Sequence, residues 1–335
     1  MNGIRYAIRS LLYYWKLNLT MVLGVALSTA ILLGAFVIGD SVTYSLKQIT
    51  LQRLGNTDWV ITGGERLFRA ELASEIASDE LEVTPLLFAN GMAVLDGGKA
   101  RANQLQVWGV KTGFDAFAGT DHLYELESNE AVINEQLARV LGVEVGEELL
   151  LRVNKLSTFP ANTPFVSADE STISFRVQVK AIVSLEQTGN FNLQAIQSAP
   201  KNIFVSLDFL NQQMQLGDLS NVVLVNGAGL DESALLRRIA ANWKLEDLNL
   251  SVRENVDLNY TELVSDRVFI EPSVAGKLLK GSGTYPVFSY FVNQLKIQDQ
   301  ATPYSFVAGL PSTMLNLGAN EIIINRWLAD DLSAA

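Results

Sequence analysis

A stretch of 23 residues without a charge, Leu17–Gly39, constrains this chain more than any other part of its sequence. As an α-helix the stretch would rise about 34 Å, which is enough to cross a hydrocarbon core of about 30 Å. The sequence therefore predicts a transmembrane helix over residues 17–39. A cleaved signal peptide is the alternative, but its apolar region would span only about 7–15 residues, and "AFVIGDS" fits a small-residue cleavage site badly.

Small residues recur at four-residue spacing within this segment. Gly24 and Ser28 form one pair, and Ala30 and Gly34 form another. Because small side chains let the backbones of two membrane helices approach closely, these four residues are candidate helix–helix contacts. The same spacing also fits a membrane helix that simply tolerates glycine and alanine, so both interpretations stay open.

The charges on either side of the segment predict its orientation. Residues 1–16 carry +3, and residues 40–335 carry −14 of the total net charge of −11. The positive-inside rule places the N-terminus in the cytoplasm and the remainder outside, in the periplasm or extracellular space. Residues 1–16 mix basic, aromatic and leucine side chains, which is typical of a segment in the membrane interface. The acidic body argues against nucleic-acid binding, which needs a basic face.

Helical spacing continues beyond the apolar segment. Val42, Leu46 and Ile49 recur at intervals of three and four residues, and no helix-breaking residue precedes Gly55. We therefore expect the membrane helix to continue outward as a stalk over residues 40–55.

From Trp59 onward, short apolar runs separated by Gly, Pro and Asn replace the long helical pattern. These runs predict strands that alternate with short amphipathic helices. Asn134 is expected to cap a helix over "EQLARVL", which Gly142 ends. The pattern indicates an α+β body of mixed layers, with no long parallel series of strands and helices.

Part of this body is repeated. "NEAVINEQLA" from Asn129 and "NEIIINRWLA" from Asn320 share six of ten residues. Two further matching strands precede each copy. A proline enters the first of them, Pro85 in the first copy and Pro286 in the second. We therefore predict a partial duplication, with a strand and a capped helix in each copy. By this comparison the second copy is incomplete, which indicates an interrupted chain.

No group of residues indicates catalysis. The single histidine, His122, lies beside Asp121, but such a pair without a convergent nucleophile is more often part of a surface loop. The absence of cysteine excludes disulfides, thiolate metal sites and a cysteine nucleophile. A P-loop is missing, because "GKLLKGSG" has its lysines and glycines in the wrong order. We expect no catalytic, cofactor-binding or metal-binding residue, and therefore no enzyme.

Several stretches resemble the MacB/FtsX-like permeases of ATP-binding cassette (ABC) transporters. The most specific is "NEAVINEQLARVLGVEVGEELLLRV", followed by "APKNIFVSLDFLNQQM" with "NVVLV" after it. "DRVFIEPSVA", "YFVNQLKIQDQATPYSFVAGL" and "NEIIINRWLADDL" resemble a subgroup with an enlarged external region. The resemblance covers essentially the whole chain.

The resemblance implies a permease subunit in the bacterial inner membrane that pairs with a separate ABC-type ATPase. It implies a homodimer or a pair of permeases in which ATP-driven movement passes through the first helix and stalk to a periplasmic core domain. The cargo would be a lipoprotein, lipid, peptide or drug. On this chain the first helix is Leu17–Gly39, the stalk Asp40–Leu54, and the core element Asn129–Val153.

One departure from the family matters. The family has three or more further membrane helices, whereas this sequence has no second apolar run of that length, so we expect a fragment or a part completed by another chain. The alternative function is a singly anchored periplasmic binding or scaffold protein that acts without ATP, and an anchored hydrolase is the weakest hypothesis. The expected organisation is an interfacial segment (1–16), a transmembrane helix (17–39), a stalk helix (40–55), a first periplasmic core region (56–258) and a second, incomplete core-like region (259–335).

Overall fold

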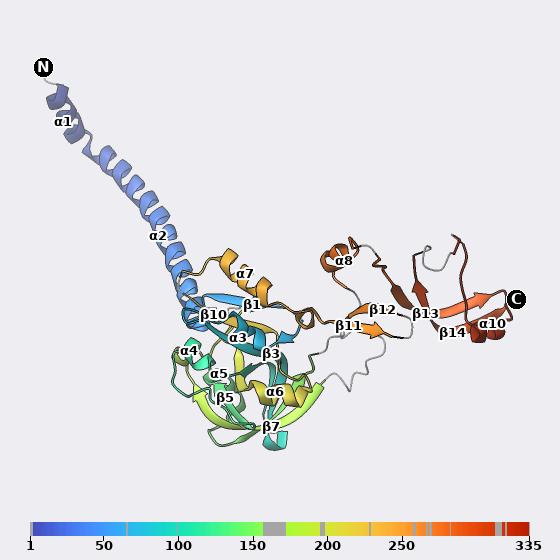
Figure 1. Cartoon of the computed structure of the whole chain (residues 1–335). Coiled ribbons are helices and arrows are strands. Elements are labelled where there is room, and N and C mark those ends of the chain that lie inside the picture. The colour runs from blue at the N-terminus through green and yellow to red at the C-terminus, as the bar shows by residue number, and fades with distance from the viewer. Residues whose placement is uncertain are drawn as a thin grey trace. The chain divides into compact units, whose positions relative to one another are not determined.

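The chain divides into two compact units, Met1–Asp266 and Arg267–Ala335. The computed structural model describes all residues except 1–2, 65, 99, 157–171, 195–197, 228, 257–258, 266, 268–269, 282, 312–316, 319 and 335. Helices and strands both contribute extensively, which confirms the predicted α+β class (Figure 1).

The helices and strands have the following bounds. The helices of the first unit are α1 (Gly3–Tyr13), α2 (Trp15–Leu54), α3 (Glu71–Ile76), α4 (Phe114–Ala118), α5 (Glu135–Leu141), α6 (Leu207–Met214) and α7 (Glu232–Asn242), with 3₁₀ turns η1 (Asp96–Gly98), η3 (Leu185–Gln187) and η4 (Glu246–Leu248). Its strands are β1 (Trp59–Thr62), β2 (Phe68–Arg69), β3 (Glu82–Leu95), β4 (Arg101–Val110), β5 (Glu130–Asn134), β6 (Glu148–Asn154), β7 (Thr172–Val183), β8 (Lys201–Ser206), β9 (Leu219–Ser220), β10 (Val222–Asn226), β11 (Leu250–Asn255) and β12 (Tyr260–Ser265). The second unit contains α8 (Pro272–Leu278), β13 (Phe288–Ile297), β14 (Gln300–Gly309) and α10 (Arg326–Asp331).

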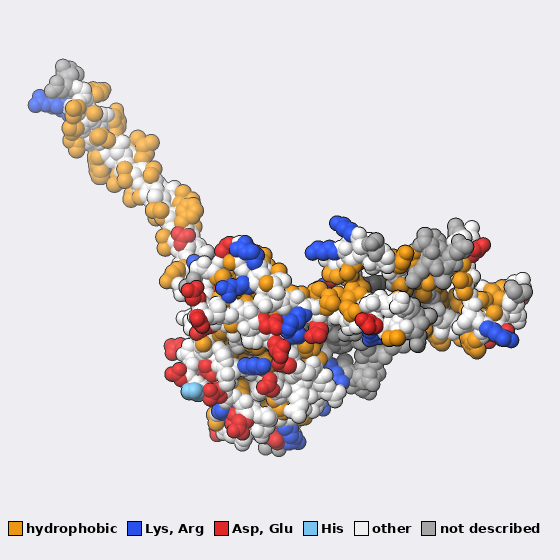
Figure 2. All heavy atoms as spheres, in the orientation of Figure 1, with side chains coloured by type: hydrophobic (Ala, Val, Ile, Leu, Met, Phe, Trp, Pro, Cys, Tyr) orange, Lys and Arg blue, Asp and Glu red, His pale blue; other side chains and the backbone are white. Residues whose placement is uncertain are grey.

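The α2 helix is unbroken for 40 residues, the long blue helix of Figure 1. It contains both the uncharged segment and the residues expected to form the stalk. Hydrophobic side chains cover much of its surface (Figure 2). Its basic residues are Lys16 in the first turn and Lys47 and Arg53 beyond the uncharged segment. Among the described residues, α2 alone has the length and composition to cross a membrane.

Six strands of the first unit close into a ring. They follow the order β3-β4-β8-β5-β7-β6, and β6 pairs back with β3. The 14-residue β3 makes this possible, because its first half pairs with β10 and its second half with β6. Gly91 lies where β6 crosses, and a Cβ there would lie 2.6 Å from the carbonyl oxygen of Arg152. The closed ring differs from the mixed layers expected from the sequence, since strand alternation specifies a buried face but not the strand order.

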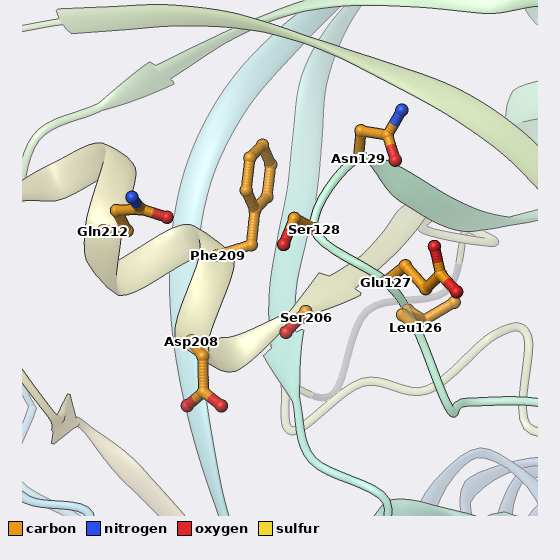
Figure 3. A pocket seen from close by; sticks show the side chains of 8 residues that line it. All are labelled: Leu126, Glu127, Ser128, Asn129, Ser206, Asp208, Phe209 and Gln212. Atoms are coloured by element: carbon orange, nitrogen blue, oxygen red, sulfur yellow. The ribbon is translucent and has the colours of Figure 1, made fainter.

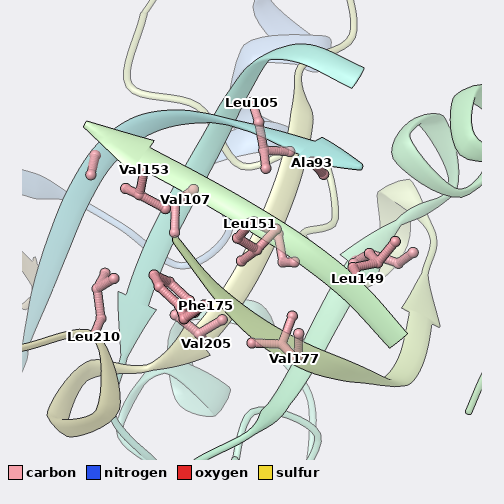
Figure 4. Packing of buried hydrophobic residues seen from close by; sticks show 14 of the residues in the cluster. Ala93, Leu105, Val107, Leu149, Leu151, Val153, Phe175, Val177, Val205 and Leu210 are labelled. Carbon is pink, nitrogen blue, oxygen red and sulfur yellow. The ribbon is translucent and has the colours of Figure 1, made fainter. Parts of the chain in front are cut away.

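The main core draws alternate residues from all six strands of the ring. Val107, Leu151 and Val205 are fully buried in it, and α6 adds Leu207 and Leu210 (Figure 4). Each such side chain contributes about 1.5–3 kcal/mol through its removal from water. A second cluster, rich in aromatic residues, packs on the other face of β4 and β8.

A buried ion-pair network fixes η4 to the body. The Arg69 guanidinium donates to Asp247 at 2.9–3.1 Å and to both carboxylate oxygens of Glu75 at 3.0 Å. The side chain of Asp247 is fully buried, and it also accepts from the backbone N–H of Arg69 and of Lys244. The Lys244 ammonium donates to Glu75 at 2.8 Å. The network therefore joins β2, α3 and η4, the segment that leads to β11.

The hydrogen bonds from Arg69 and Lys244 lower the pKa of Glu75 to about 2, from its ordinary 4.5. A depressed pKa means that the stabilising contribution is complete above about pH 4.5 and is lost as pH falls toward 2. We expect acid to lower the urea midpoint of the wild-type chain more than that of Glu75→Gln between pH 4.5 and 2. Equal losses in the two proteins would contradict the assignment.

The hairpin of the second unit repeats the pairing of β3 with β4. In the first unit Leu87 pairs with Gly109, and in the second Phe288 pairs with Gly309. In each hairpin the first residue of the pair lies two positions after the proline that enters the strand. The two hairpins therefore pair in the same register relative to the entering proline and to the glycine.

The interruption of the pairing is repeated as well. Gln104 and Tyr304 each lie five residues before the glycine, and neither has a partner in the ladder. Both have a positive φ, 57° and 55° respectively, which is uncommon for residues other than glycine. The shared backbone conformation supports a structural repeat, although only the first hairpin shifts register at this point.

The capped helix is the third repeated element. The side chain of Asn134 accepts a hydrogen bond from the backbone N–H of Leu137 at 3.0 Å, and Asn325 accepts from Leu328 at 2.8 Å. The helix α10 packs against β14, as α5 packs against β4. The predicted capping of α5 by Asn134 is therefore confirmed, and α10 is capped in the same way.

The strand predicted before α10 is wrong. Residues 321–325 form no strand, whereas the matching residues 130–134 form β5. The reason lies in pairing, since β5 is hydrogen-bonded to both β7 and β8. Among the described residues of the second unit, no strand is placed to pair with 321–325, so its backbone lacks a ladder.

Candidate functional site at the junction of α2 and the body

The four small residues of the apolar segment lie on two faces of α2. Gly24 and Ser28 share one face, and the Ser28 hydroxyl donates to the Gly24 carbonyl at 3.0 Å. Ala30 and Gly34 share another face, about 120° around the helix at about 100° per residue. Within the single chain described here the segment is exposed or half-exposed throughout, so contact with a second helix stays a prediction.

The stalk residues Val42, Leu46 and Ile49 lie together on one face of α2, within an arc of about 60°. All three are exposed. Together they form an apolar stripe that continues beyond the uncharged segment.

The C-terminal end of α2 is held against the body by Gly55 and Asn56. Gly55 has φ 57° and ψ −137°, a combination that is essentially restricted to glycine. A Cβ at this position would lie 2.2 Å from the carbonyl oxygen of Phe117. That same oxygen accepts from the backbone N–H of Asn56 at 2.8 Å, and the Asn56 side chain donates to Ala116 at 2.9 Å.

The contact surface on the body is itself tightly hydrogen-bonded. It consists of the C-terminal end of α4 and the turn after η3, where the Thr188 hydroxyl donates to the carbonyl of Ala118 at 3.2 Å. The Tyr124 hydroxyl donates to the carbonyl of Gln187 at 2.8 Å, and burial is the largest cause that raises the pKa of Tyr124. The Asp115 carboxylate accepts from the backbone N–H groups of residues 123 and 124. The segments that hold α2 are therefore fixed to one another.

The junction lies on the aromatic core. Phe117 belongs to the buried aromatic cluster of the first unit, in which the Phe114 ring lies 4.8 Å from Tyr124 and 5.6 Å from Phe204. Because protein interiors are close-packed, a displacement of Phe117 must be absorbed by its neighbours. The end of α2 is therefore hydrogen-bonded to a residue of the same buried cluster as Phe204 of β8.

An open cavity of about 480 Å³ lies beside the N-terminal end of α6. Phe209 and Asp208 of α6 line it, together with Ser128 and Asn129 of the loop before β5 (Figure 3). Its lining combines hydroxyl, amide and carboxylate groups, with neither histidine nor a basic residue. No nucleophile–base pair is assembled there.

His122 lies in an exposed turn with φ 55°. Its Nδ1 lies 2.8 Å from a carboxylate oxygen of Glu125, and this contact raises the pKa of His122. Its partner is therefore Glu125 rather than the adjacent Asp121. In the part of the chain that the structure describes, no three His, Asp or Glu side chains are grouped as metal ligands.

Sequence reasoning placed the end of α2 at Gly55 but did not identify Asn56 or Phe117. The only local signal was the glycine at the end of a long helical pattern, followed by an asparagine. The partner carbonyl lies some sixty residues further along the chain, and no spacing rule connects the two.

The fold and the junction define a closed α+β body attached to one long helix of membrane-spanning length. No family model matches the sequence, and no curated protein matches it. The structure is similar to the periplasmic region of MacB from Actinobacillus actinomycetemcomitans, with 11% identity and a TM-score of 0.37, over 70% of this chain and 97% of that one. It is also similar to the extracellular domain of the ABC-type transporter YknZ from Gram-positive bacteria, with 13% identity and a TM-score of 0.31, over 57% and 91% of the two chains.

Proposed function

We propose that this chain is part of a permease subunit of an ABC transporter, in which α2 transmits movement from the membrane to the external body. The observation that supports the proposal best is the continuity of α2. One helix runs from the uncharged segment to Gly55, where its end is hydrogen-bonded to the body. A flexible linker would suffice for a tether, whereas a rigid helix with a fixed end can transmit displacement.

In this proposal the energy comes from a separate ABC-type ATPase on the cytoplasmic side. The chain itself performs no catalysis and moves a lipoprotein, lipid, peptide or drug. The apolar stripe of Val42, Leu46 and Ile49 and the small residues of α2 contact a second permease helix, in a homodimer or a paired permease. The setting is a bacterial inner membrane.

The orientation can be tested by cysteine labelling, because the chain has no cysteine of its own. Ser10→Cys and Ser45→Cys are matched changes at exposed positions on opposite sides of the uncharged segment. We expect a membrane-impermeant maleimide to label Ser45→Cys on intact spheroplasts, and to label Ser10→Cys only after permeabilisation. The reverse pattern would overturn the orientation, and labelling of both positions before permeabilisation would overturn the membrane span.

The ATPase partner can be tested by isolating the tagged chain from its native membranes. We expect a P-loop ATPase to copurify in a fixed ratio, and the isolated complex to hydrolyse ATP. A chain that is extracted folded, without an ATPase and without hydrolysis, would favour the alternative of a singly anchored binding or scaffold protein. That alternative is supported by the open polar cavity beside α6.

A further inference from the structure

We propose that the free edge of β14 accepts one apolar strand followed by a helix, with the chemistry of the chain's own β8–α6 segment, Lys201–Met214. The inference rests on the structural repeat and is independent of the proposed transport function. The first copy shows what packs against β4, and the second copy shows the same positions uncovered.

In the first unit, β4 has strands on both sides. One side is β3, and the other is β8, which runs parallel with Val107 opposite Ile203 and Gly109 opposite Val205. In the second unit β14 pairs with β13, and no other described strand pairs with it. Val307 is the residue of β14 that matches Val107, two positions before the repeated glycine.

The two glycines indicate that the occupant includes a helix as well as a strand. A Cβ on Gly109 would lie 3.1 Å from the side chain of Leu210 and 3.2 Å from that of Leu207, both in α6. Glycine is therefore needed at 109 because α6 lies directly on the strand. Gly309 has the same place in its hairpin, yet a Cβ there would meet only Phe288, at 3.6 Å or more. Gly309 therefore has room for a side chain, and no described residue takes the place that Leu207 and Leu210 have beside Gly109.

Exposure follows the same division. The residues of β4 from Val107 to Val110 are buried, whereas the matching residues 307–310 are half-buried or exposed. The segment 321–325 matches β5 in sequence, but its Ile322 and Ile323 are exposed and it forms no strand. In the first copy the matching strand, β5, pairs antiparallel with β8. One β8-like strand would therefore pair with β14 and give 321–325 its ladder.

The sequence of β8 and α6 indicates which side chains the occupant needs. Four of its six residues, Asn202–Val205, are buried, with apolar side chains on both faces of the strand, and α6 contributes Leu207, Leu210 and Met214 to the core. Its residues Ile203–Val205 form an uninterrupted apolar run, as is typical of a strand covered on both faces. Main-chain hydrogen bonds would supply its affinity, and the position above Gly309 would select for the helix that follows.

The test uses the full-length chain in detergent and a synthetic peptide with the sequence of residues 199–214. Val307→Cys in the chain is combined with a peptide carrying Ile203→Cys, the in-register partner. Neighbouring strands lie about 4.8 Å apart, so oxidation can join this pair. We expect at least about tenfold more cross-linked product than with a Phe204→Cys peptide, whose cysteine lies on the opposite face. The matched control is Val107→Cys, at the edge that β8 already covers, where we expect no peptide adduct.

A further variant tests the helix. Gly309→Val should leave the β13–β14 hairpin intact, as hydrogen exchange of its amides can verify, but should reduce the in-register cross-link at least about fivefold by occupying the space above the strand. An unchanged cross-link would overturn the helix assignment. Equal cross-linking of both peptides, or none, would overturn the strand assignment. A disulfide between the Val307→Cys residues of two chains without peptide would show instead that the edge binds a second copy.

Discussion

Replacing Arg69 by methionine is expected to destabilise the first unit by about 3–5 kcal/mol, because it leaves a buried carboxylate without its cation. The side chain of Asp247 is fully buried, and it receives two hydrogen bonds from the Arg69 guanidinium at 2.9 and 3.1 Å. Methionine fills a similar volume but supplies neither charge nor donors. The loss therefore comes from the uncompensated charge rather than from a cavity.

Urea unfolding of the full-length chain measures this effect. Trp243, one of five tryptophans in the chain, lies near the network, with its ring 6.2 Å from that of Phe68, the neighbour of Arg69. The matched control is Arg237→Met on the exposed surface of α7, where we expect a change below about 1 kcal/mol. A double variant with Asp247→Leu should recover part of the loss, because it removes the stranded charge as well. Equal effects of Arg69→Met and Arg237→Met would contradict a buried, charge-dependent network.

Local sequence patterns predicted the local structure well. The uncharged run gave a helix, the alternating runs gave strands, and Asn134 and Gly142 lie at the two ends of α5 as expected. Each of these features depends on residues that are close together in the sequence. Capping residues and apolar alternation are therefore visible in the sequence itself.

Long-range features could not be predicted in this way. Arg69 and Asp247 lie 178 residues apart, and each is an ordinary charged residue in its own neighbourhood. The closure of the ring depends on the second half of β3 meeting β6, which alternation leaves open. The segment 321–325 shows the converse case, since it has the sequence of a strand but no described partner. A strand pattern is realised only where another strand supplies the hydrogen bonds.

The junction of α2 with the body is the other feature that the sequence could not specify, and Gly55→Val tests it most severely. A valine side chain would place its Cβ 2.2 Å from the Phe117 carbonyl oxygen and would have to adopt φ 57° with ψ −137°. Such a backbone conformation alone costs about 1–3 kcal/mol for a residue other than glycine. We expect the end of α2 to detach, with loss of the Asn56 hydrogen bonds to Phe117 and Ala116.

The expected result is local. The Asn56 amide should exchange hydrogen at least about tenfold faster, as about 1.4 kcal/mol of lost local stability gives, while amides in β4 and β8 keep their protection. Gly142→Ala is the control, because Gly142 also has a positive φ, 65°, but a Cβ there would meet nothing within 4 Å. If the two variants exchange alike at Asn56, α2 is not fixed to the body by this contact. A detached but folded body would show that the junction can be lost without unfolding the body.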